Sequence, residues 1–190
     1  METYRLFIAA ELAPEAKAEL TAAQDRLRRG DPPIRWVAPE AMHLTLKFLG
    51  ETDVALLPAL AAAMRSALSD EPPFSLRLAA AGAFPNLRRP SVVWAGVGGA
   101  VAALGRIQAS LDAALATIGI ARDERPFSPH LTLGRVRREA SAEQQERIGA
   151  AVRALPPLRP IGWTVDDIVL FRSELSGAGP TYTQLESVQF

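Results

Sequence analysis

The chain has 190 residues, 48% of them hydrophobic and 22% charged, which is long enough for a buried core and typical of a globular rather than a disordered protein. Its 21 basic and 21 acidic residues give a formal net charge of zero, which excludes the overall positive field that holds a long nucleic-acid backbone. The absence of cysteine excludes disulfides, thiolate nucleophiles and Cys-containing zinc sites, and it fits a reducing compartment, so we expect a cytoplasmic protein.

The first half of the chain predicts a strand, a helix, two short strands and a second helix. The apolar residues 4–10 are typical of a buried strand and too few for a signal peptide or a membrane span. Pro14 fits the first turn of a helix that ends near "RRGDPP". The extended pieces "IRWV" and "HLTLKFLG" follow, and residues 53–68 repeat the helical pattern.

The second half repeats this order. "FSLRLAAAGAF" and "SVVWAGV" predict strands on either side of the loop "PNLRRP". A third helix is expected from about residue 100 to 118, followed by the strand "RPFSPHLTLGRV". Ser141 and Gln144 form a capping-box pattern that opens a fourth helix. The strands "GWTVDDIVLFRS" and "TYTQLESV", separated by the turn "ELSGAGP", complete the chain.

These elements predict an α+β fold with mainly antiparallel sheets, because strands follow one another through short connections without a strict βαβ rhythm. Because the two halves have the same order of elements, we expect one domain over residues 1–190. It would have two lobes related by an approximate two-fold axis, with helices outside and the sheets lining a central cleft. The halves would meet near residues 85–100, and the pattern leaves open whether the chain crosses between lobes.

The tetrapeptide "HLTL" stands at the centre of each repeat, at residues 43–46 and 130–133, and contains the only two histidines of the chain. On a strand, residues i and i+2 point to one face, so His43 with Thr45, and His130 with Thr132, each place an imidazole beside a hydroxyl. The leucines between them face the core. A two-fold axis would bring both pairs to one centre, an arrangement that suits a phosphate.

Two histidines at a phosphate can act as acid and base at neutral pH. One deprotonates the attacking oxygen and the other protonates the leaving oxygen, each contributing a factor on the order of 10² to 10⁴. The threonine hydroxyls can donate to the non-bridging oxygens. This chemistry needs no metal and no cofactor.

Either tetrapeptide alone is more simply explained as an amphipathic strand, since alternating patterns are common. Both histidines, however, occur in identical tetrapeptides with the same order of predicted elements around them, and this favours the catalytic interpretation. A metal site with two histidines would need carboxylates, and none is encoded beside either tetrapeptide.

At these residues the sequence resembles the two-histidine (2H) phosphoesterase superfamily, and most closely the RNA 2′,3′-cyclic phosphodiesterases, also called 2′-5′ RNA ligases. The similar stretches are "RLFIAAEL", "HLTLKFLGE", "AGAFPNLRRPSVVWAGV", "RPFSPHLTLGR" and "LFRSELSGAGPTYTQL". The resemblance implies hydrolysis of a terminal 2′,3′-cyclic phosphate to a 2′-phosphate, and in some members ATP-independent 2′-5′ joining of RNA ends.

The resemblance also implies roles for single residues. His43 would donate a proton to the departing 3′ oxygen, and His130 would accept one from the nucleophile. Thr45 and Thr132 would contact the phosphate. The implied partners are RNA ends or small nucleotides that carry a cyclic phosphate, and we expect a monomer without a membrane or protein partner.

Strict alternation predicts opposite faces for Arg135 and Lys47. Strict alternation places Arg135 on the leucine face, unless Gly134 marks a bulge that turns it toward His130 and makes it a phosphate ligand. Strict alternation places Lys47 on the face of His43. Arg35 either reaches a phosphate or lies on the surface.

The remaining candidates are aromatic or basic. Phe48 is expected in the core, and Phe127 either lies there or stacks on a base. The loop "PNLRRP" and Arg172 are local basic features that are expected to be solvated. Two other functions remain open: a phosphodiesterase for small cyclic nucleotides, and a non-catalytic module that binds RNA ends.

Overall fold

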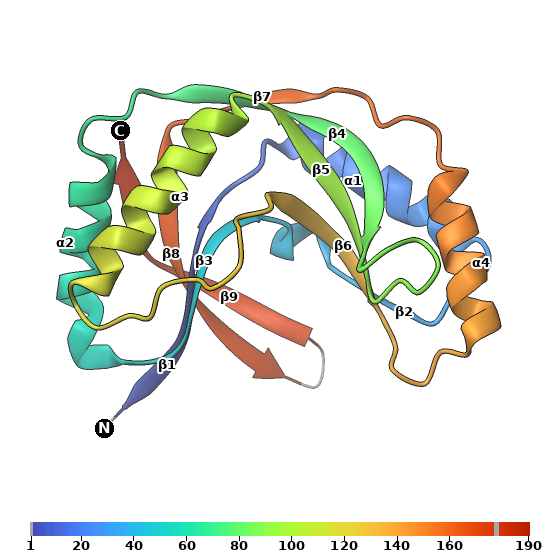
Figure 1. The fold of residues 1–190 in the computed structure, drawn as a ribbon, viewed down its shortest axis with the longest axis horizontal. Coiled ribbons are helices and arrows are strands. Elements are labelled where there is room, and N and C mark those ends of the chain that lie inside the picture. Colours follow the sequence, from blue (N-terminus) through green and yellow to red (C-terminus); the bar gives the residue numbers. More distant parts are fainter. Residues whose placement is uncertain (1, 177–178) are drawn as a thin grey trace.

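The computed structural model describes residues 2–176 and 179–190, which form two antiparallel sheets flanked by α-helices (Figure 1). In chain order the elements are β1 (Thr3–Ala10), α1 (Pro14–Arg28), β2 (Ile34–Trp36), η1 (Pro39–Ala41), β3 (Leu44–Asp53), η2 (Val54–Leu56), α2 (Leu57–Leu68), β4 (Phe74–Phe84), β5 (Val92–Gly99), α3 (Val101–Ala116), β6 (His130–Val136), α4 (Ala142–Arg153), β7 (Gly162–Val165), β8 (Asp167–Ser176) and β9 (Gly179–Gln189). No helix among the described residues is both long and apolar enough to cross a membrane.

The two sheets confirm the predicted α+β class. Sheet A has the strand order β3-β1-β8-β9 and sheet B the order β2-β6-β5-β4-β7, with antiparallel pairing throughout. The series β3-β1-β8 in sheet A corresponds to β6-β5-β4 in sheet B. In both series, the strand with the tetrapeptide lies beside a strand that leads into a helix, β1 before α1 and β5 before α3.

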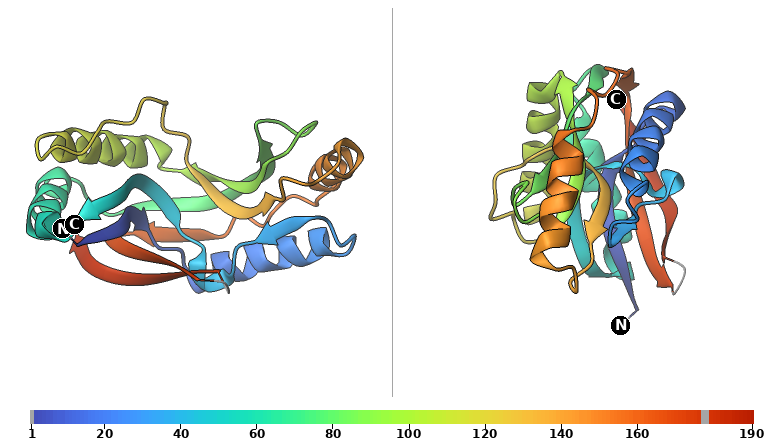
Figure 2. Two further views of the ribbon diagram at one scale, coloured as in Figure 1. Left: turned by 90° about the horizontal axis from the view of Figure 1, so that it is seen from below. Right: turned by 90° about the vertical axis from the view of Figure 1, so that its right-hand side faces the viewer.

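The two halves of the chain are interlocked. Sheet A combines β1 and β3 with the last two strands, whereas β2 and β4 belong to sheet B. Helix α2 packs against α3, and α1 packs against α4, so each end of the elongated molecule holds one helix from each half (Figure 2). The chain therefore crosses between the lobes, the possibility that the sequence left open.

Local hydrogen bonds define the start of two predicted helical segments, whereas the strand predicted over "RPFSPHLTLGRV" begins only at His130. The Ser141 hydroxyl accepts from the backbone of Gln144 at 3.2 Å, and the Gln144 side chain accepts from the backbone of Ser141 at 2.8 Å, which confirms the capping box. The Asp53 carboxylate accepts from the backbone of Ala55 at 3.0 Å and begins η2.

The prediction of one strand over "GWTVDDIVLFRS" is wrong. Val165 pairs with Phe74 in sheet B, whereas Asp167 pairs with Gln189 in sheet A, so the chain changes sheet at Asp166. Apolar and polar residues alternate in both halves of the segment, and this alternation does not indicate which strand each half pairs with. Part of the predicted turn "ELSGAGP", residues 177–178, lies outside the described residues.

The leucines of both tetrapeptides are buried in one core that the two sheets share with the helices. Leu44 and Leu46 are 0% and 3% exposed, and Leu131 and Leu133 are 1% and 0% exposed. Burying one leucine contributes about 1.5–3 kcal/mol. A register slip of one residue would turn these leucines to solvent, so their burial fixes which face carries the histidines and threonines.

Each tetrapeptide is followed by a bulge at the equivalent position. In β3, Thr45 pairs with Ala9 but Lys47 pairs with Ile8, so Leu46 is the extra residue. In β6, Thr132 pairs with Trp94 and Gly134 with Val93, so Leu133 is the extra residue. A bulge shifts the alternation by one position.

Because of these bulges, strict alternation fails beyond both tetrapeptides. Lys47 and Gly134 turn to the core side, where their partners Ile8 and Val93 are both fully buried. Arg135 turns to the face of His130, where it is exposed. The predicted alternative with a bulge is the one that the structure shows, but the extra residue is Leu133, and Gly134 follows it.

Gly134→Ala is expected to lower the free energy of unfolding by about 1–3 kcal/mol, because overpacking strains a filled interior. An added Cβ would lie 2.5 Å from Ile34 Cγ2 and 3.0 Å from Trp36 Cε3, on the neighbouring strand β2. Urea unfolding measures the change. The control is Gly105→Ala in α3, where nothing lies within 4 Å of an added Cβ, and it should raise stability by about 0.5–1 kcal/mol. Equal effects of the two variants would contradict the packing argument.

Candidate active site

His43 and Thr45 lie on an aromatic face of sheet A. The His43 ring stacks on Phe7 with centroids 4.6 Å apart and meets the Tyr182 ring edge-on at 5.1 Å. Thr45 is opposite Ala9, whose small side chain belongs to the same buried cluster as Phe7. We call this the site face of sheet A.

His130 and Thr132 lie on the corresponding site face of sheet B. The His130 ring meets Phe84 edge-on at 5.0 Å, and Thr132 is opposite Trp94. The Trp94 ring covers Gly82, where an added Cβ would lie 2.4 Å from the indole, so only glycine permits this approach. Each imidazole therefore packs against aromatic side chains of its own sheet.

Both imidazoles are hydrogen-bonded to the backbone two residues before them. His130 Nδ1 lies 2.7 Å from the Ser128 carbonyl oxygen. A carbonyl only accepts, so Nδ1 carries a hydrogen and Nε2 is left with a lone pair in the neutral ring. His43 has the equivalent hydrogen bond with the backbone of Ala41. Both imidazoles are thus held by the backbone two residues before the ring.

The pKa of His43 is lowered from 6.5 to about 4, mainly by burial and to a smaller extent by the Lys17 charge, while the hydrogen bond with Ala41 acts to raise it. In the free protein the His43 imidazole is therefore neutral at pH 7. A phosphate anion beside the ring favours the imidazolium and raises the pKa. The proton-donor role predicted for His43 thus requires bound substrate.

The two site faces are connected through Tyr182 and Arg135. Burial raises the pKa of Tyr182, and the charges of Arg135 and Arg5 partly offset this rise. Tyr182 touches His43, and Arg135 shares the site face of sheet B with His130 and Thr132. Strands β3 and β6 also contact each other directly. The electrostatic interaction between Arg135 and Tyr182 therefore links the surroundings of the two tetrapeptides.

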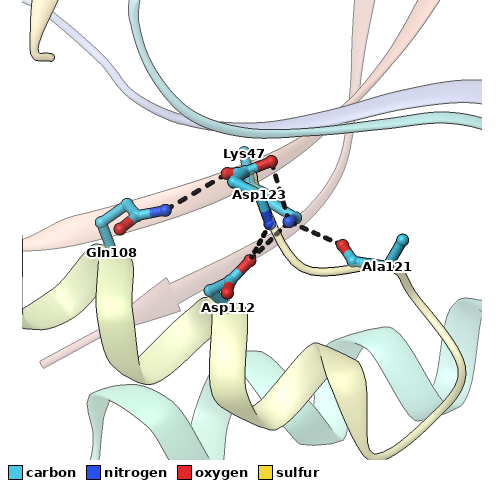
Figure 3. A network of polar contacts seen from close by, with 5 residues as sticks. All are labelled: Lys47, Gln108, Asp112, Ala121 and Asp123. Atoms are coloured by element: carbon cyan, nitrogen blue, oxygen red, sulfur yellow. Dashed lines mark hydrogen bonds and ion pairs between the residues drawn. The ribbon is translucent and has the colours of Figure 1, made fainter. Parts of the chain in front are cut away.

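Lys47 lies on the opposite side of β3 from Thr45, so its predicted place beside His43 is wrong; the bulge at Leu46 is the reason. Its side chain is 2% exposed, and its ammonium lies 2.5 Å from Asp112, 3.0 Å from Asp123 and 2.8 Å from the carbonyl of Ala121 (Figure 3). These contacts tie β3 to α3 and to the segment that leads to β6. Lys47 is a structural residue.

The carboxyl of Asp112 is kept ionised by this cation and its other partners. Burial acts to raise the pKa of its carboxyl, but hydrogen bonds from Lys47 and from the backbone of Asp123, together with the nearby positive charges, hold that pKa below its usual value. Gln108 donates to Asp123 at 3.3 Å and completes the network. Three segments distant in sequence are thus joined around one buried ammonium.

The other candidate residues from the sequence lie in different surroundings. Phe48 was expected in the core, but it is 65% exposed, because the same bulge turns it to the site face beside Phe7. Phe127 packs partly buried against the core. Arg35 is exposed opposite Arg135. Arg172 lies over the Tyr4 ring and pairs with Glu174 at 2.9 Å, away from the imidazoles.

Sequence reasoning missed Phe7 and Tyr182, which touch His43. Both lie in alternating strands and carry no motif of their own. The only signal was the resemblance, because Phe7 lies in the similar stretch "RLFIAAEL" and Tyr182 in "LFRSELSGAGPTYTQL". Tyr182 enters the site because β9 joins sheet A, a pairing that the sequence pattern does not reveal.

Within the described part of the chain, no group of three His, Cys, Asp or Glu residues is placed to hold a metal ion. A broad surface hollow lies beside α1 and is lined by Lys17, Thr21 and Glu40 among others. Neither tetrapeptide lines it. The paired tetrapeptides remain the candidate site.

Comparisons with known proteins agree on one family. The profile of the 2′-5′ RNA ligase superfamily matches residues 12–177. An RNA 2′,3′-cyclic phosphodiesterase of Methanothermobacter thermautotrophicus is 34% identical, with 96% of each chain covered. One from Thermus thermophilus is 36% identical, with 96% of this chain and 88% of the relative covered.

Solved structures agree with the sequence matches. The crystal structure of a Thermus thermophilus protein has a TM-score of 0.81 and 33% identity, with 97% of each chain covered. Escherichia coli LigT complexed with 3′-AMP has a TM-score of 0.80 and 28% identity, with 99% of this chain and 98% of LigT covered.

In a proton NMR titration of the free protein, the His43 ring is expected to change protonation near pH 4. Inorganic phosphate should raise this midpoint, because an anion favours the imidazolium. His43→Asn identifies the signal. A midpoint near 6.5 in free protein would contradict the effect of burial, and a midpoint unmoved by phosphate would contradict a phosphate site beside His43.

Lys47→Met is expected to lower the free energy of unfolding by about 3–5 kcal/mol at pH 7, because it leaves the carboxylate of Asp112 without its cation. The control is Arg147→Met, which removes an exposed ion pair to Glu143 on α4 and should cost less than about 1 kcal/mol. Urea unfolding compares the two variants. A small cost for Lys47→Met would show that the network adds little to stability.

Proposed function

The chain belongs to the 2′-5′ RNA ligase superfamily, and from this premise we propose that it hydrolyses terminal 2′,3′-cyclic phosphates of RNA to 2′-phosphates. One observation carries the proposal. Two His-x-Thr motifs occur at the start of the equivalent strands β3 and β6, and each imidazole is hydrogen-bonded to the backbone two residues before it. Relatives named as RNA 2′,3′-cyclic phosphodiesterases match nearly the whole chain.

In the proposed reaction His130 is the base. Its Nδ1 hydrogen bond to Ser128 leaves the Nε2 lone pair to accept a proton from water. The water oxygen forms a bond to phosphorus, and the bond from phosphorus to the 3′ oxygen breaks. The 2′ oxygen keeps the phosphate.

His43 is the acid in this reaction and gives its proton to the departing 3′ oxygen. The ring is neutral in the free protein, so it must take up a proton when the anionic substrate binds. Burial and the charge of Lys17 disfavour the imidazolium, so the proton taken up with the substrate is readily given to the departing oxygen. After one turnover His130 holds a proton and His43 lacks one, and exchange with solvent restores both.

Thr45, Thr132 and Arg135 would stabilise the phosphate. The hydroxyls can donate to non-bridging oxygens, where charge builds up in the transition state. The guanidinium of Arg135 is exposed on the site face, and its planar donors match phosphate oxygens. The three residues come from both sheets, as a group enclosed between two faces requires.

The same geometry supports a related reaction. If a 5′-hydroxyl replaces water as the nucleophile, the product is a 2′-5′ phosphodiester, and no ATP is consumed. A phosphodiesterase for small cyclic nucleotides is the second candidate, since the LigT structures include complexes with 3′-AMP and ATP. A non-catalytic module that binds RNA ends is the third. The predicted cytoplasmic location and monomeric state stay predictions.

Purified protein is expected to open a 2′,3′-cyclic phosphate in the presence of EDTA and to release a 2′-phosphate product. His43→Ala and His130→Ala should each reduce kcat on the order of 10²- to 10⁴-fold, because each removes one proton transfer. Chromatography that resolves 2′- from 3′-phosphates measures product. The double variant, purified in parallel, reports contaminating nucleases. Full activity in both single variants would overturn the mechanism, and tight RNA-end binding without product would favour the non-catalytic module.

A further inference from the structure

Arg35 and Arg135 are direct partners across the antiparallel pair β2 and β6. Opposite residues in such a pair share a face, and like charges placed there destabilise the sheet. Both side chains are exposed. Within residues 2–176 and 179–190 neither guanidinium has an ion pair or a side-chain hydrogen bond. The pair is thus a concentrated positive charge without a counter-ion from the described chain.

Further arginines without ion pairs lie at the same end of sheet B. Val92 pairs with Arg135, and the Ser91 carbonyl accepts from the backbone of Val136 at 2.9 Å, which places the loop 85–91 beside them. This loop carries exposed Arg88 and Arg89, whose backbone N–H groups both donate to the Asn86 side chain.

Six arginines elsewhere in the described chain are paired with carboxylates: Arg28, Arg65, Arg106, Arg147, Arg159 and Arg172. The exposed arginines Arg35, Arg88, Arg89 and Arg135 lie together at one end of sheet B without such a pair among the described residues, and we call this group the arginine edge.

The arginine edge is continuous with the candidate active site. Arg135 shares the site face of sheet B with His130 and Thr132, and its charge acts on Tyr182, which touches His43. Arg35 lies one strand further out, at the edge of the sheet. A strand of RNA with its terminal phosphate at the histidines would therefore pass Arg135 before Arg35.

We propose that Arg35, with Arg135 beside it, binds the phosphodiester on the 5′ side of the terminal nucleotide. The preferred substrate class is then an RNA oligonucleotide that ends in a 2′,3′-cyclic phosphate, rather than a cyclic mononucleotide, which lacks this phosphodiester. Two adjacent guanidiniums supply the planar, charged donors that phosphate oxygens accept, and the phosphate removes the repulsion between them. This inference rests on the proposed function.

The kinetic test compares a 2′,3′-cyclic mononucleotide with a pentanucleotide that ends in a 2′,3′-cyclic phosphate. The wild-type protein should prefer the pentanucleotide in kcat/KM by about tenfold, since a charged hydrogen bond is lost without it. Arg35→Ala should remove this preference and leave the rate on the mononucleotide unchanged. The control is Arg153→Ala, which removes an exposed, unpaired arginine from the end of α4 and should change neither rate.

The salt dependence provides an independent readout. Each phosphate contact to single-stranded nucleic acid contributes about −0.7 to the slope of log affinity against log salt concentration. The slope measured with the pentanucleotide should become shallower by about that amount in Arg35→Ala and stay unchanged in Arg153→Ala. Equal slopes for all three proteins would overturn the proposal.

A binding measurement tests the role of Arg35 independently of the proposed catalytic function. Fluorescence anisotropy with a labelled pentanucleotide that ends in a 2′-phosphate requires no turnover, and Arg35→Ala should weaken its binding about tenfold relative to Arg153→Ala. If the wild type opens neither cyclic phosphate, the proposed function fails while this comparison still decides the role of Arg35. Equal binding by both variants, or equal wild-type rates on the two substrates, would show that Arg35 contacts no RNA phosphate.

Discussion

Two constraints on the tetrapeptide strands determine which side chains reach the candidate site. The leucines must be buried, which fixes the face of His43, Thr45, His130 and Thr132. The bulge after each threonine then reverses the alternation, so that a residue needed in the interior can follow directly. In sheet A that residue is a lysine with buried ion pairs, and in sheet B it is a glycine that lets β2 approach.

The same reversal gives the two site faces different chemistry. Beyond the bulge, β3 presents the exposed ring of Phe48, and the equivalent position of β6 presents the guanidinium of Arg135. A terminal nucleotide has both an aromatic base and a charged phosphate, and these two surfaces match them separately. The two repeated strands are thus identical through the tetrapeptide and differ from the next residue onward.

Much of this could be read from the sequence because local chemistry determined it. The capping box at Ser141, the first turn at Pro14 and the buried leucines all depend on residues near in sequence. What could not be read depends on partners distant in sequence. The bulge at Leu46 is defined by pairing with β1, the change of sheet at Asp166 by pairing with β4 and β9, and the contact of Tyr182 with His43 by the closure of sheet A.

The interlocked halves also set an order for the synthesis of the molecule on the ribosome. Strand β1 is synthesised first but pairs with β8. The stacking contact between Phe7 and Phe171 therefore cannot form until nearly the whole chain has been made. Contacts between residues so distant in sequence form late and slowly. A truncated nascent chain would contain His43, Thr45, His130 and Thr132 and yet lack the aromatic surroundings that burial of His43 requires. The aromatic surroundings of His43 are therefore complete only once β8 and β9 have joined sheet A.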